Sequence, residues 1–410
     1  MLSFSAFLTE AMSESDLPGV PKVLHDFLFH LSGPSDPAGK TKRSMSENFD
    51  FYSEATLFDI NRGDKPGAMA HKSMNLPKTS AIINKSKEEG LGEGENLHKK
   101  IGAGFHKAFG EMDHEKPAET KSKLKEAHAV LHQFAKDRGF KTRPDLLGEN
   151  GKTKKSTGEG VHTKGLALAP HATNGLKDFD VCPRASKECR KNCLGTEAGG
   201  NRQYPDAALS SKVLRTHFIA SHPEHAARIL DSEVGKHVKS ATKAGYKPGV
   251  RLNVTSDIAW EKHAPQLFKR HPTAQFYDYT KMHNRVGHPN LPENYHLSLS
   301  HTGSGHAESN DKEAASALHK GHVVAMVYQR GKNSPKPTHV EDVKSGKRFP
   351  VVGGDEDDNT FDRHAQAGLH EGKKDQGVVS GLKLKGVKNE DAGHFANKVD
   401  ADGVIRINKH

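Results

Sequence analysis

The stretch Val250-Arg-Leu-Asn-Val254 runs directly into Thr255-Ser-Asp257, and this change from apolar to polar residues recurs along the second half of the chain. Similar short apolar runs occupy residues 276–279, 296–300 and 322–328, each separated from the next by a longer amphipathic segment. Strand starts recur at the spacing of one strand plus one crossover helix, as parallel strands require. The pattern predicts an α/β fold, and we expect a partial or complete βα-barrel-like domain with parallel strands.

The predicted elements extend on both sides of this stretch. Strands are predicted at residues 165–170, 250–254, 276–279, 296–300, 322–328, 349–352 and 377–382, and helices at 207–221, 225–243, 258–269 and 312–320. In a parallel barrel or open sheet, the residues that follow the strands gather at one edge, where the site lies. The alternative is that the strands simply end in polar turns.

All three cysteines of the 410-residue chain fall within twelve positions, at Cys182, Cys189 and Cys193. An odd, clustered count argues against a disulfide scaffold and for a reducing compartment. Thiolates are the ligands that iron–sulfur clusters and zinc prefer, so we predict a metal site, with a [4Fe–4S] cluster as the first interpretation. Zinc completed by a histidine such as His171 or His217, and unligated thiols, are the alternatives.

Further candidate residues follow the central predicted strands. Asp257 and Glu261 are four positions apart, so a helix would place both carboxylates on one face, where they can bind a metal or act as acid and base. Ser256 or Asp257 serves equally well as a helix cap, and Trp260 is expected in the core. Lys281, just past a strand end, is suited to hold a phosphate or carboxylate. We predict catalytic roles for Asp257, Glu261 and Lys281, and cofactor binding by Arg251, Asn253, Ser256 and Ser300.

Five carboxylates lie within eight positions near the carboxyl end of the chain, at Asp355, Glu356, Asp357, Asp358 and Asp362. Such density can bind a divalent cation, but the spacing matches no EF-hand loop. We therefore expect a solvated acidic turn.

The amino-terminal third differs in composition from the rest. It is polar, with helical periodicity only at residues 17–31, 97–109 and 118–136. Only 33% of the whole chain is hydrophobic, which suggests that part of it packs no core. We predict a partly disordered amino-terminal region with short helices at 1–147, an α/β domain at 148–397 and a tail at 398–410.

The charge and hydropathy of the chain limit its partners. The net charge of +10 favours contact with nucleic acid or other polyanions, but the lysines are scattered, so a solvated surface explains them about as well. No apolar run approaches the roughly 20 residues that a membrane-spanning helix needs, so we expect no membrane contact. The substrate, a small molecule or a macromolecule, is not identified by the sequence.

The chain contains, in this order, the blocks Cys182-Pro-Arg-Ala-Ser-Lys-Glu-Cys-Arg-Lys-Asn-Cys-Leu194, Arg251-Leu-Asn-Val-Thr-Ser-Asp257, Phe276-Tyr-Asp-Tyr-Thr-Lys281 and Leu291-Pro-Glu-Asn-Tyr-His296. These and other ordered blocks resemble the phage gene product 88 domain family over about residues 148–397. The resemblance implies a tailed-phage protein in the host cytoplasm, with packaging in the virion as a further expectation, but no reaction. Leu8-Thr9-Glu10 resembles a prohead-protease site, and an ordinary amphipathic amino terminus is the alternative.

A strand followed by a three-cysteine loop is also similar to the layout of radical S-adenosylmethionine enzymes. There three thiolates hold three irons of a [4Fe–4S] cluster and the fourth iron binds the cofactor. This chain departs from their usual C-x3-C-x2-C spacing and has no Gly-Gly-Glu after the second predicted strand. Two hypotheses follow: a redox or radical iron–sulfur enzyme, or a non-enzymatic virion-associated or nucleic-acid-binding protein with a structural zinc site.

Overall fold

The computed structural model describes residues 76–408 except for 95, 150, 172, 178, 194–204, 330–334, 370–375, 386–388, 390 and 391. The helix predicted at residues 17–31 and the Leu8-Thr9-Glu10 motif lie outside the described residues.

Within the described part of the chain, ten strands form one mostly parallel sheet in the order β1-β2-β3-β4-β5-β6-β9-β8-β7-β10. The strands are β1 (Leu147–Gly148), β2 (Val161–Leu166), β3 (Lys247–Arg251), β4 (Gln275–Thr280), β5 (Tyr295–Ser300), β6 (Val323–Tyr328), β7 (His339–Asp342), β8 (Lys347–Gly353), β9 (Val378–Lys383) and β10 (Val404–Ile407). Every neighbouring pair from β2 to β8 is parallel, whereas β1 and β7 run antiparallel to β2 and β8. The predicted α/β fold with parallel strands is confirmed, and the sheet is open, with β1 and β10 at its ends.

The predicted strands from residue 250 onward are each observed within a few residues, but the first is displaced. It was predicted at residues 165–170, whereas β2 covers Val161–Leu166, where pairing with β3 aligns Val161 with Lys247 and Gly165 with Arg251. The apolar residues beyond it are buried as well, Leu168 and Ala169 among them, although they lie in a loop. Burial therefore explains the apolar run, and backbone pairing sets the strand.

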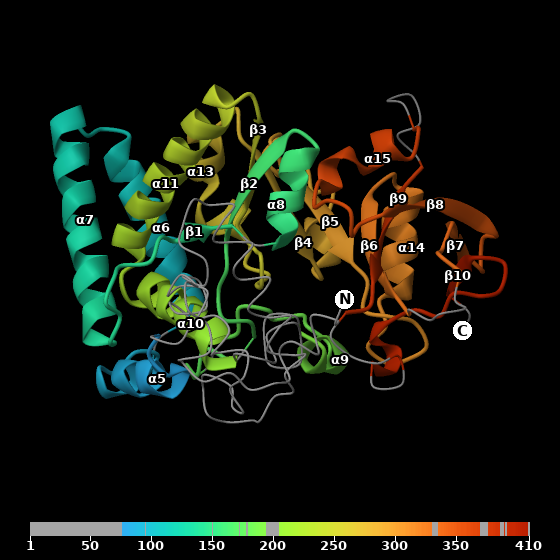
Figure 1. Ribbon diagram of the computed structural model, residues 1–410, viewed down its shortest axis with the longest axis horizontal. Coiled ribbons are helices and arrows are strands. Elements are labelled where there is room, and N and C mark those ends of the chain that lie inside the picture. Colours follow the sequence, from blue (N-terminus) through green and yellow to red (C-terminus); the bar gives the residue numbers. More distant parts are fainter. Residues whose placement is uncertain are drawn as a thin grey trace, which may run out of the picture.

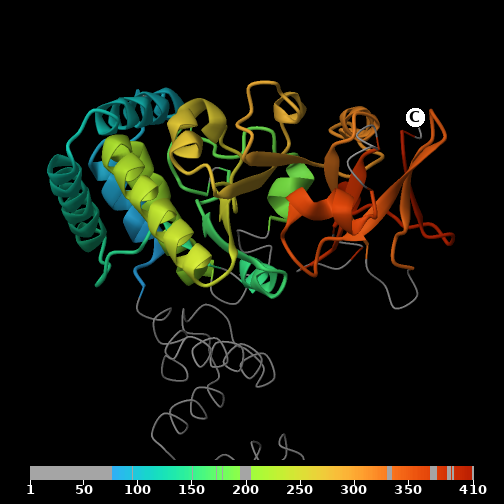
Figure 2. The ribbon, with the colours of Figure 1, turned by 90° about the horizontal axis from the view of Figure 1, so that it is seen from above.

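Helices flank the sheet along its length. They are α5 (Thr79–Glu88), α6 (Leu97–Met112), α7 (Pro117–Asp137), α8 (Gly151–Gly158), α9 (Lys187–Lys191), α10 (Pro205–Ser221), α11 (Pro223–Lys243), α12 (Trp260–His263), α13 (Pro265–Arg270), α14 (Asp311–His319) and α15 (Arg363–Gln366), with 3-10 turns η1 (His283–Arg285), η2 (Thr360–Asp362) and η3 (Gly393–Phe395). Figures 1 and 2 show α6, α7 and α11 gathered at one end of the molecule and β7 and β10 at the other. The helices predicted at 97–109 and 118–136 are confirmed as α6 and α7.

One hydrophobic core joins the amino-terminal helices to the first half of the sheet. Phe105 of α6 packs on Trp260, with ring centroids 5.4 Å apart. Trp260 is fully buried, and its Nε1 atom donates a hydrogen bond to the Leu252 carbonyl (3.1 Å). The expectation that Trp260 is a core residue is therefore confirmed, and α6 belongs to the same packing unit as the strands.

A second cluster lies under the other half of the sheet. Leu318 of α14 packs there with Val324 of β6 and Phe349 of β8. Ile405 of β10 belongs to this cluster too, because β10 pairs with β7 in parallel. Part of the segment predicted as a tail, residues 398–410, is thus a strand of the sheet.

A buried charge cluster fastens the amino-terminal helices to α11. Arg228 donates hydrogen bonds to both carboxylate oxygens of Glu115 (2.6 and 2.9 Å) and to Glu111 (2.6 Å), while Lys123 of α7 donates to Glu115 (3.0 Å). The side chain of Glu115 is only 3% exposed. The hydrogen bonds from Arg228 lower the pKa of Glu115 to about 2, so the carboxylate stays ionised.

We expect Glu115→Gln to reduce the free energy of unfolding by about 2–3 kcal/mol at pH 7, because it leaves Arg228 without its main counter-charge. The folded-state pKa of Glu115 lies below the unfolded value, so this stabilisation is present above about pH 4.5 and is lost as the pH falls towards 2. Guanidinium denaturation of both proteins between pH 7 and pH 3 measures it. The control is Lys107→Ala, which breaks the exposed Lys107–Glu224 pair between α6 and α11. It should change the free energy of unfolding little.

Candidate functional site

The ends of β3, β4 and β5 meet at one edge of the sheet. The Lys281 backbone N–H, just after β4, donates to Asp257 Oδ2 in the loop after β3 (2.8 Å). The Lys281 ammonium donates to Ser300 Oγ at the end of β5 (3.1 Å) and to the His301 carbonyl (3.4 Å). Three of the predicted site residues, Asp257, Lys281 and Ser300, therefore lie together, as expected from parallel topology.

Asn253 shapes the loop that follows β3. Its Oδ1 atom accepts hydrogen bonds from Ser256 Oγ (2.8 Å) and from the Ile258 backbone N–H (2.9 Å), and its Nδ2 donates to the Ile258 carbonyl (2.9 Å). Asn253 is 2% exposed. The structure thus places the predicted cofactor-binding residues Asn253 and Ser256 in direct contact, with the Asn253 amide holding the loop closed.

The cysteine loop lies against the same edge. The Asp257 backbone N–H donates to the Val181 carbonyl (2.7 Å), and the thiol of Cys182 lies 3.6 Å from the Thr255 carbonyl. Asp180 accepts a hydrogen bond from the Cys182 backbone N–H (2.7 Å) and pairs with Arg190 of α9 (2.7 Å). These contacts attach the cysteine loop to the loop after β3.

The three cysteines are half-buried and form no disulfide. Cys189 lies in α9, whose first turn is capped by Ser186 Oγ accepting from the Cys189 backbone N–H (3.1 Å). Burial raises the pKa of the Cys182 thiol, and the neighbouring Cys193 and Cys189 raise it further. Among the described residues, no three His, Cys, Asp or Glu side chains surround a point where a single metal ion could sit.

The two histidines considered as further ligands have different surroundings. Both ring nitrogens of His217 are hydrogen-bonded, Nδ1 with Ser86 Oγ (2.8 Å) and Nε2 with the Asn174 carbonyl (2.7 Å). His171 lies next to Cys182, where a hydrogen bond from its backbone favours the thiolate. The His171 Nε2 atom is buried and has no partner within the described part of the chain, and its backbone φ is 40°. Of the two histidines, His171 is the one with a ring nitrogen available near the cysteine loop.

Asp257 and Glu261 converge on one arginine, Arg285 in η1. The guanidinium donates to Asp257 Oδ1 (2.7 Å) and forms a bidentate pair with Glu261 (2.8 Å to each oxygen). The helix α12 begins only at Trp260, so the carboxylates meet through Arg285 and not along one helix face. Burial raises the pKa of Asp257, while Arg285 acts to lower it. Asp257 and Glu261 remain candidate catalytic residues, and the arginine between them is a residue that the sequence did not reveal.

The acidic segment is only partly the solvated turn that we expected, because the Glu356 side chain is 60% exposed but Asp357 and Asp358 are buried. Asp358 is fully buried and accepts a hydrogen bond from Arg251 (2.6 Å), while Asp357 is 5% exposed and pairs with Arg363 (3.0 Å). Asp278, also fully buried, lies 3.8 Å from Arg251 Nε. The prediction was wrong for Asp357 and Asp358, because these two neighbours in sequence pair with separate buried arginines, and charge density alone does not show this.

We expect Arg285→Met to reduce the free energy of unfolding by about 3–5 kcal/mol at pH 8, because two buried carboxylates lose their shared counter-charge. Without Arg285 the pKa of Asp257 rises further above its unfolded value, so the penalty grows as the pH rises and is smaller at pH 5. Urea denaturation at both pH values measures the difference.

The matched control is Arg348→Met, which removes an arginine that is 54% exposed and paired with Glu341 on the surface. This substitution should reduce the free energy of unfolding by less than about 1 kcal/mol at either pH. If Arg285→Met reduces the free energy of unfolding by the same amount at pH 5 and pH 8, then Arg285 does not stabilise the ionised carboxylates, and the prediction is wrong.

Comparison of the sequence with known protein families identifies the family of this chain. The profile of the family described as Gene product 88 matches residues 142–398, a range that contains the cysteine loop and the strands β1 to β9. No curated protein and no solved structure matches the chain. Among the described residues, no helix combines the length and apolarity needed to cross a membrane. Because the profile covers more than half of its length, this chain belongs to the Gene product 88 family of phage proteins.

Proposed function

We propose that Cys182, Cys189 and Cys193 bind a [4Fe–4S] cluster and that the protein is a redox or radical enzyme acting on a substrate still to be identified. The observation that carries the proposal is the position of the cysteine loop. All the thiols of the chain lie in one loop, and Cys182 contacts the loop after β3 at the edge where the strand ends meet. Parallel α/β proteins bind ligands at this edge.

The chemistry of the loop supports a cluster over an inert set of thiols. Three thiolates hold three of four irons and leave one iron open to a ligand, as in the enzymes whose layout this chain resembles. Burial lowers the pKa of Lys212 to about 8, and the neighbouring Cys193 acts in the opposite direction by raising it. A cationic side chain beside Cys193 stabilises a negatively charged cluster by electrostatic attraction.

The neighbouring polar residues supply binding groups for the substrate or cofactor. The Lys281 ammonium is suited to hold an anionic group, and Ser300 orients it through the hydrogen bond between them. Asp257 and Glu261 are proposed as the acid–base pair, positioned by Arg285. Arg251, Asn253 and Ser256 are proposed to shape the cofactor side of the site. S-adenosylmethionine is a candidate cofactor, although the cysteine spacing departs from that of the enzymes that use it.

The cluster is tested on full-length protein purified without oxygen. We expect about four irons and about four acid-labile sulfides per chain, with broad absorbance near 400 nm. Cys189→Ala should lose most of both, because the cluster then keeps only two protein thiolates. The chain has no cysteine outside this loop, so the control is Ser345→Ala, which removes a hydroxyl in the turn after β7 and should keep both the iron and the sulfide.

If the wild-type protein holds neither iron nor sulfide after anaerobic reconstitution, the proposed function is wrong. If it holds a cluster, cleavage of S-adenosylmethionine under reducing conditions is the next measurement. A cluster without cleavage would favour electron transfer over radical chemistry.

A second candidate function is a non-enzymatic, virion-associated or nucleic-acid-binding protein with a structural zinc site. The observation that favours it is His171, whose backbone bonds to the Cys182 thiol and whose buried Nε2 atom has no partner among the described residues. Burial lowers the pKa of His171, so the ring is neutral, as a zinc ligand must be. Three thiolates and one imidazole form a common structural zinc set.

For this alternative we expect one tightly bound zinc ion per chain. The substitution His171→Ala should lower the affinity for zinc at least about tenfold. The control is His339→Ala, which removes an exposed histidine of β7 and should leave zinc unchanged. Zinc content by elemental analysis separates the two functions, and salt-dependent binding of DNA or RNA would support the nucleic-acid role. Action in the host cytoplasm and packaging in the virion remain predictions.

A further inference from the structure

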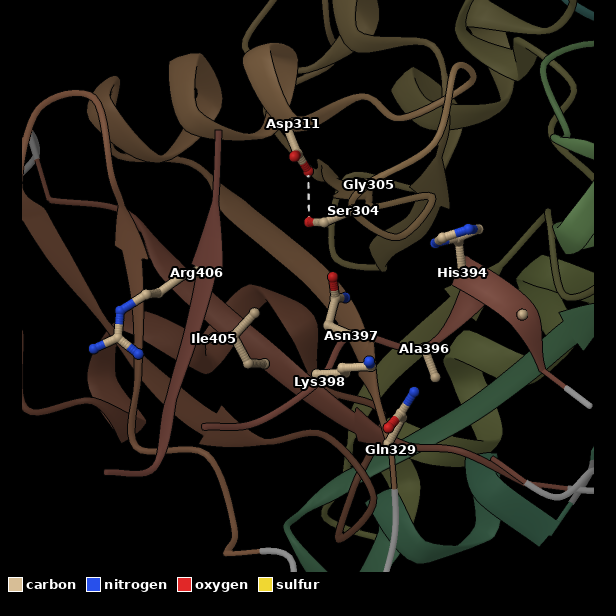
Figure 3. Close-up of a pocket in the computed structure, with 11 residues that line it drawn as sticks. Ser304, Gly305, Asp311, Gln329, His394, Ala396, Asn397, Lys398, Ile405 and Arg406 are labelled. Atoms are coloured by element: carbon tan, nitrogen blue, oxygen red, sulfur yellow. Dashed lines mark hydrogen bonds between the residues drawn. The ribbon is translucent and has the colours of Figure 1, made fainter. Parts of the chain in front are cut away.

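Figure 3 shows a pocket of about 230 Å³ whose lining residues include none of the strand-end site. Its walls come from the loop after β5, Asp311 at the start of α14, Gln329 just after β6, η3 with the residues that follow it, and β10. Two hydrogen bonds attach α9 to the segments that form these walls. The Lys187 backbone N–H donates to Glu308 (2.8 Å), and Asn192 Nδ2 donates to the Ala392 carbonyl (3.3 Å).

Asn397 is the central polar residue of this pocket. Its backbone N–H donates to the Val327 carbonyl (2.8 Å), and its carbonyl accepts from the Gln329 backbone N–H (2.9 Å). Asn397 is 4% exposed. The residue is therefore fixed to the end of β6, and its side chain has little freedom to reorient.

The surrounding hydrogen bonds determine which way the Asn397 amide faces. His301 is buried, which lowers its pKa, and its Nε2 lies 2.7 Å from Asp311 Oδ1. A neutral imidazole that donates through Nε2 to a carboxylate has an acceptor at Nδ1. Asn397 Nδ2 lies 3.2 Å from that Nδ1 and 2.9 Å from the Val327 carbonyl, so it donates to both.

The Oδ1 atom of Asn397 consequently faces away from these partners. It is buried and has no hydrogen-bond partner among the described residues. Figure 3 shows it pointing towards Ser304 across the pocket, while Arg406 turns away from the other lining side chains. A buried acceptor without a partner is unfavourable, so the pocket is suited to a ligand that offers an N–H donor here.

The other walls favour a flat ring. Ile405 and Ala396 are buried and provide apolar surface. The ring of His394 stacks on that of His306, with centroids 5.5 Å apart and an interplanar angle of 25°, and it borders the pocket opposite Asn397 (Figure 3). Lys398 lies between these walls and can donate to a ring nitrogen.

We propose that this pocket binds one amino-substituted heterocycle of nucleobase size, with its amino N–H donating to Asn397 Oδ1 and its ring against His394. The base comes either from a free nucleoside or nucleotide or from single-stranded nucleic acid. The inference does not depend on the iron–sulfur cluster, because none of these contacts involves a cysteine.

The test uses the full-length, iron-free protein and isothermal titration calorimetry with adenosine, purine riboside and a short oligo-dA. Purine riboside lacks only the amino group, so it should bind at least about tenfold more weakly than adenosine. Adenosine binding independent of salt identifies the free nucleoside as the source. Binding of oligo-dA alone, weakening as salt rises, identifies nucleic acid.

His394→Ala removes the exposed stacking ring and should weaken binding about tenfold, whereas His339→Ala should not. Because the ligand comparison requires no mutation, the proposal can be tested even if Asn397 variants fail to fold. Measurable binding of both adenosine and purine riboside with equal affinity, or no binding of any probe, would overturn it. The two proposals can fail separately. If the protein binds adenosine but takes up no cluster on anaerobic reconstitution, the proposed function is wrong and this inference is supported.

Discussion

The site at the strand ends depends on one buried carboxylate, that of Asp278. It accepts hydrogen bonds from the backbone N–H groups of Leu252 and Asn253 (3.2 and 2.8 Å), the first two residues after β3, and from the Tyr295 hydroxyl of β5 (3.1 Å). Burial raises the pKa of Asp278 to about 7, opposed by Arg251. A side chain of β4 thus bridges the strands on both sides and fixes where the loop after β3 begins.

Further buried ion pairs lie around Asp278. Arg251 lies between Asp278 and Asp358, and Arg285 lies between Asp257 and Glu261. Such pairs stabilise a fold little more than apolar residues of the same volume, because desolvation offsets their attraction. Their geometry is directional, however, so they determine loop positions that apolar contacts would leave adjustable. Hydrogen bonds hold the loop after β3 in the same way: Asn253 bonds to Ser256 and Ile258, and Asp257, which lies between those two residues in the chain, accepts from the Lys281 backbone N–H.

The sequence predicts the sheet better than the site. The apolar runs at residues 276–279 and 322–328 predict β4 and β6, because buried parallel strands are short apolar runs. The two-residue strand β1 and the polar strand β7 carry no such signal, and β10, although apolar at three of its four positions, is short and was missed. The cysteines were recognisable because they cluster in the chain. Arg285 and Asn397 were not, since their partners lie far away in sequence, as with Asn397 and His301, 96 positions apart. Such pairings depend on the tertiary fold and have no local pattern.

The helix α9 connects the cysteine loop to the pocket, and this places the two sites under a shared constraint. Its first residue is held by Glu308, from the loop after β5, and its carboxyl end by the Ala392 carbonyl beside η3. On its other side Arg190 pairs with Asp180, which in turn holds the Cys182 backbone. A five-residue helix has little stability of its own, so its position follows these neighbours. The spacing between Cys182 and Cys189 therefore depends on the same segments that form the walls of the pocket.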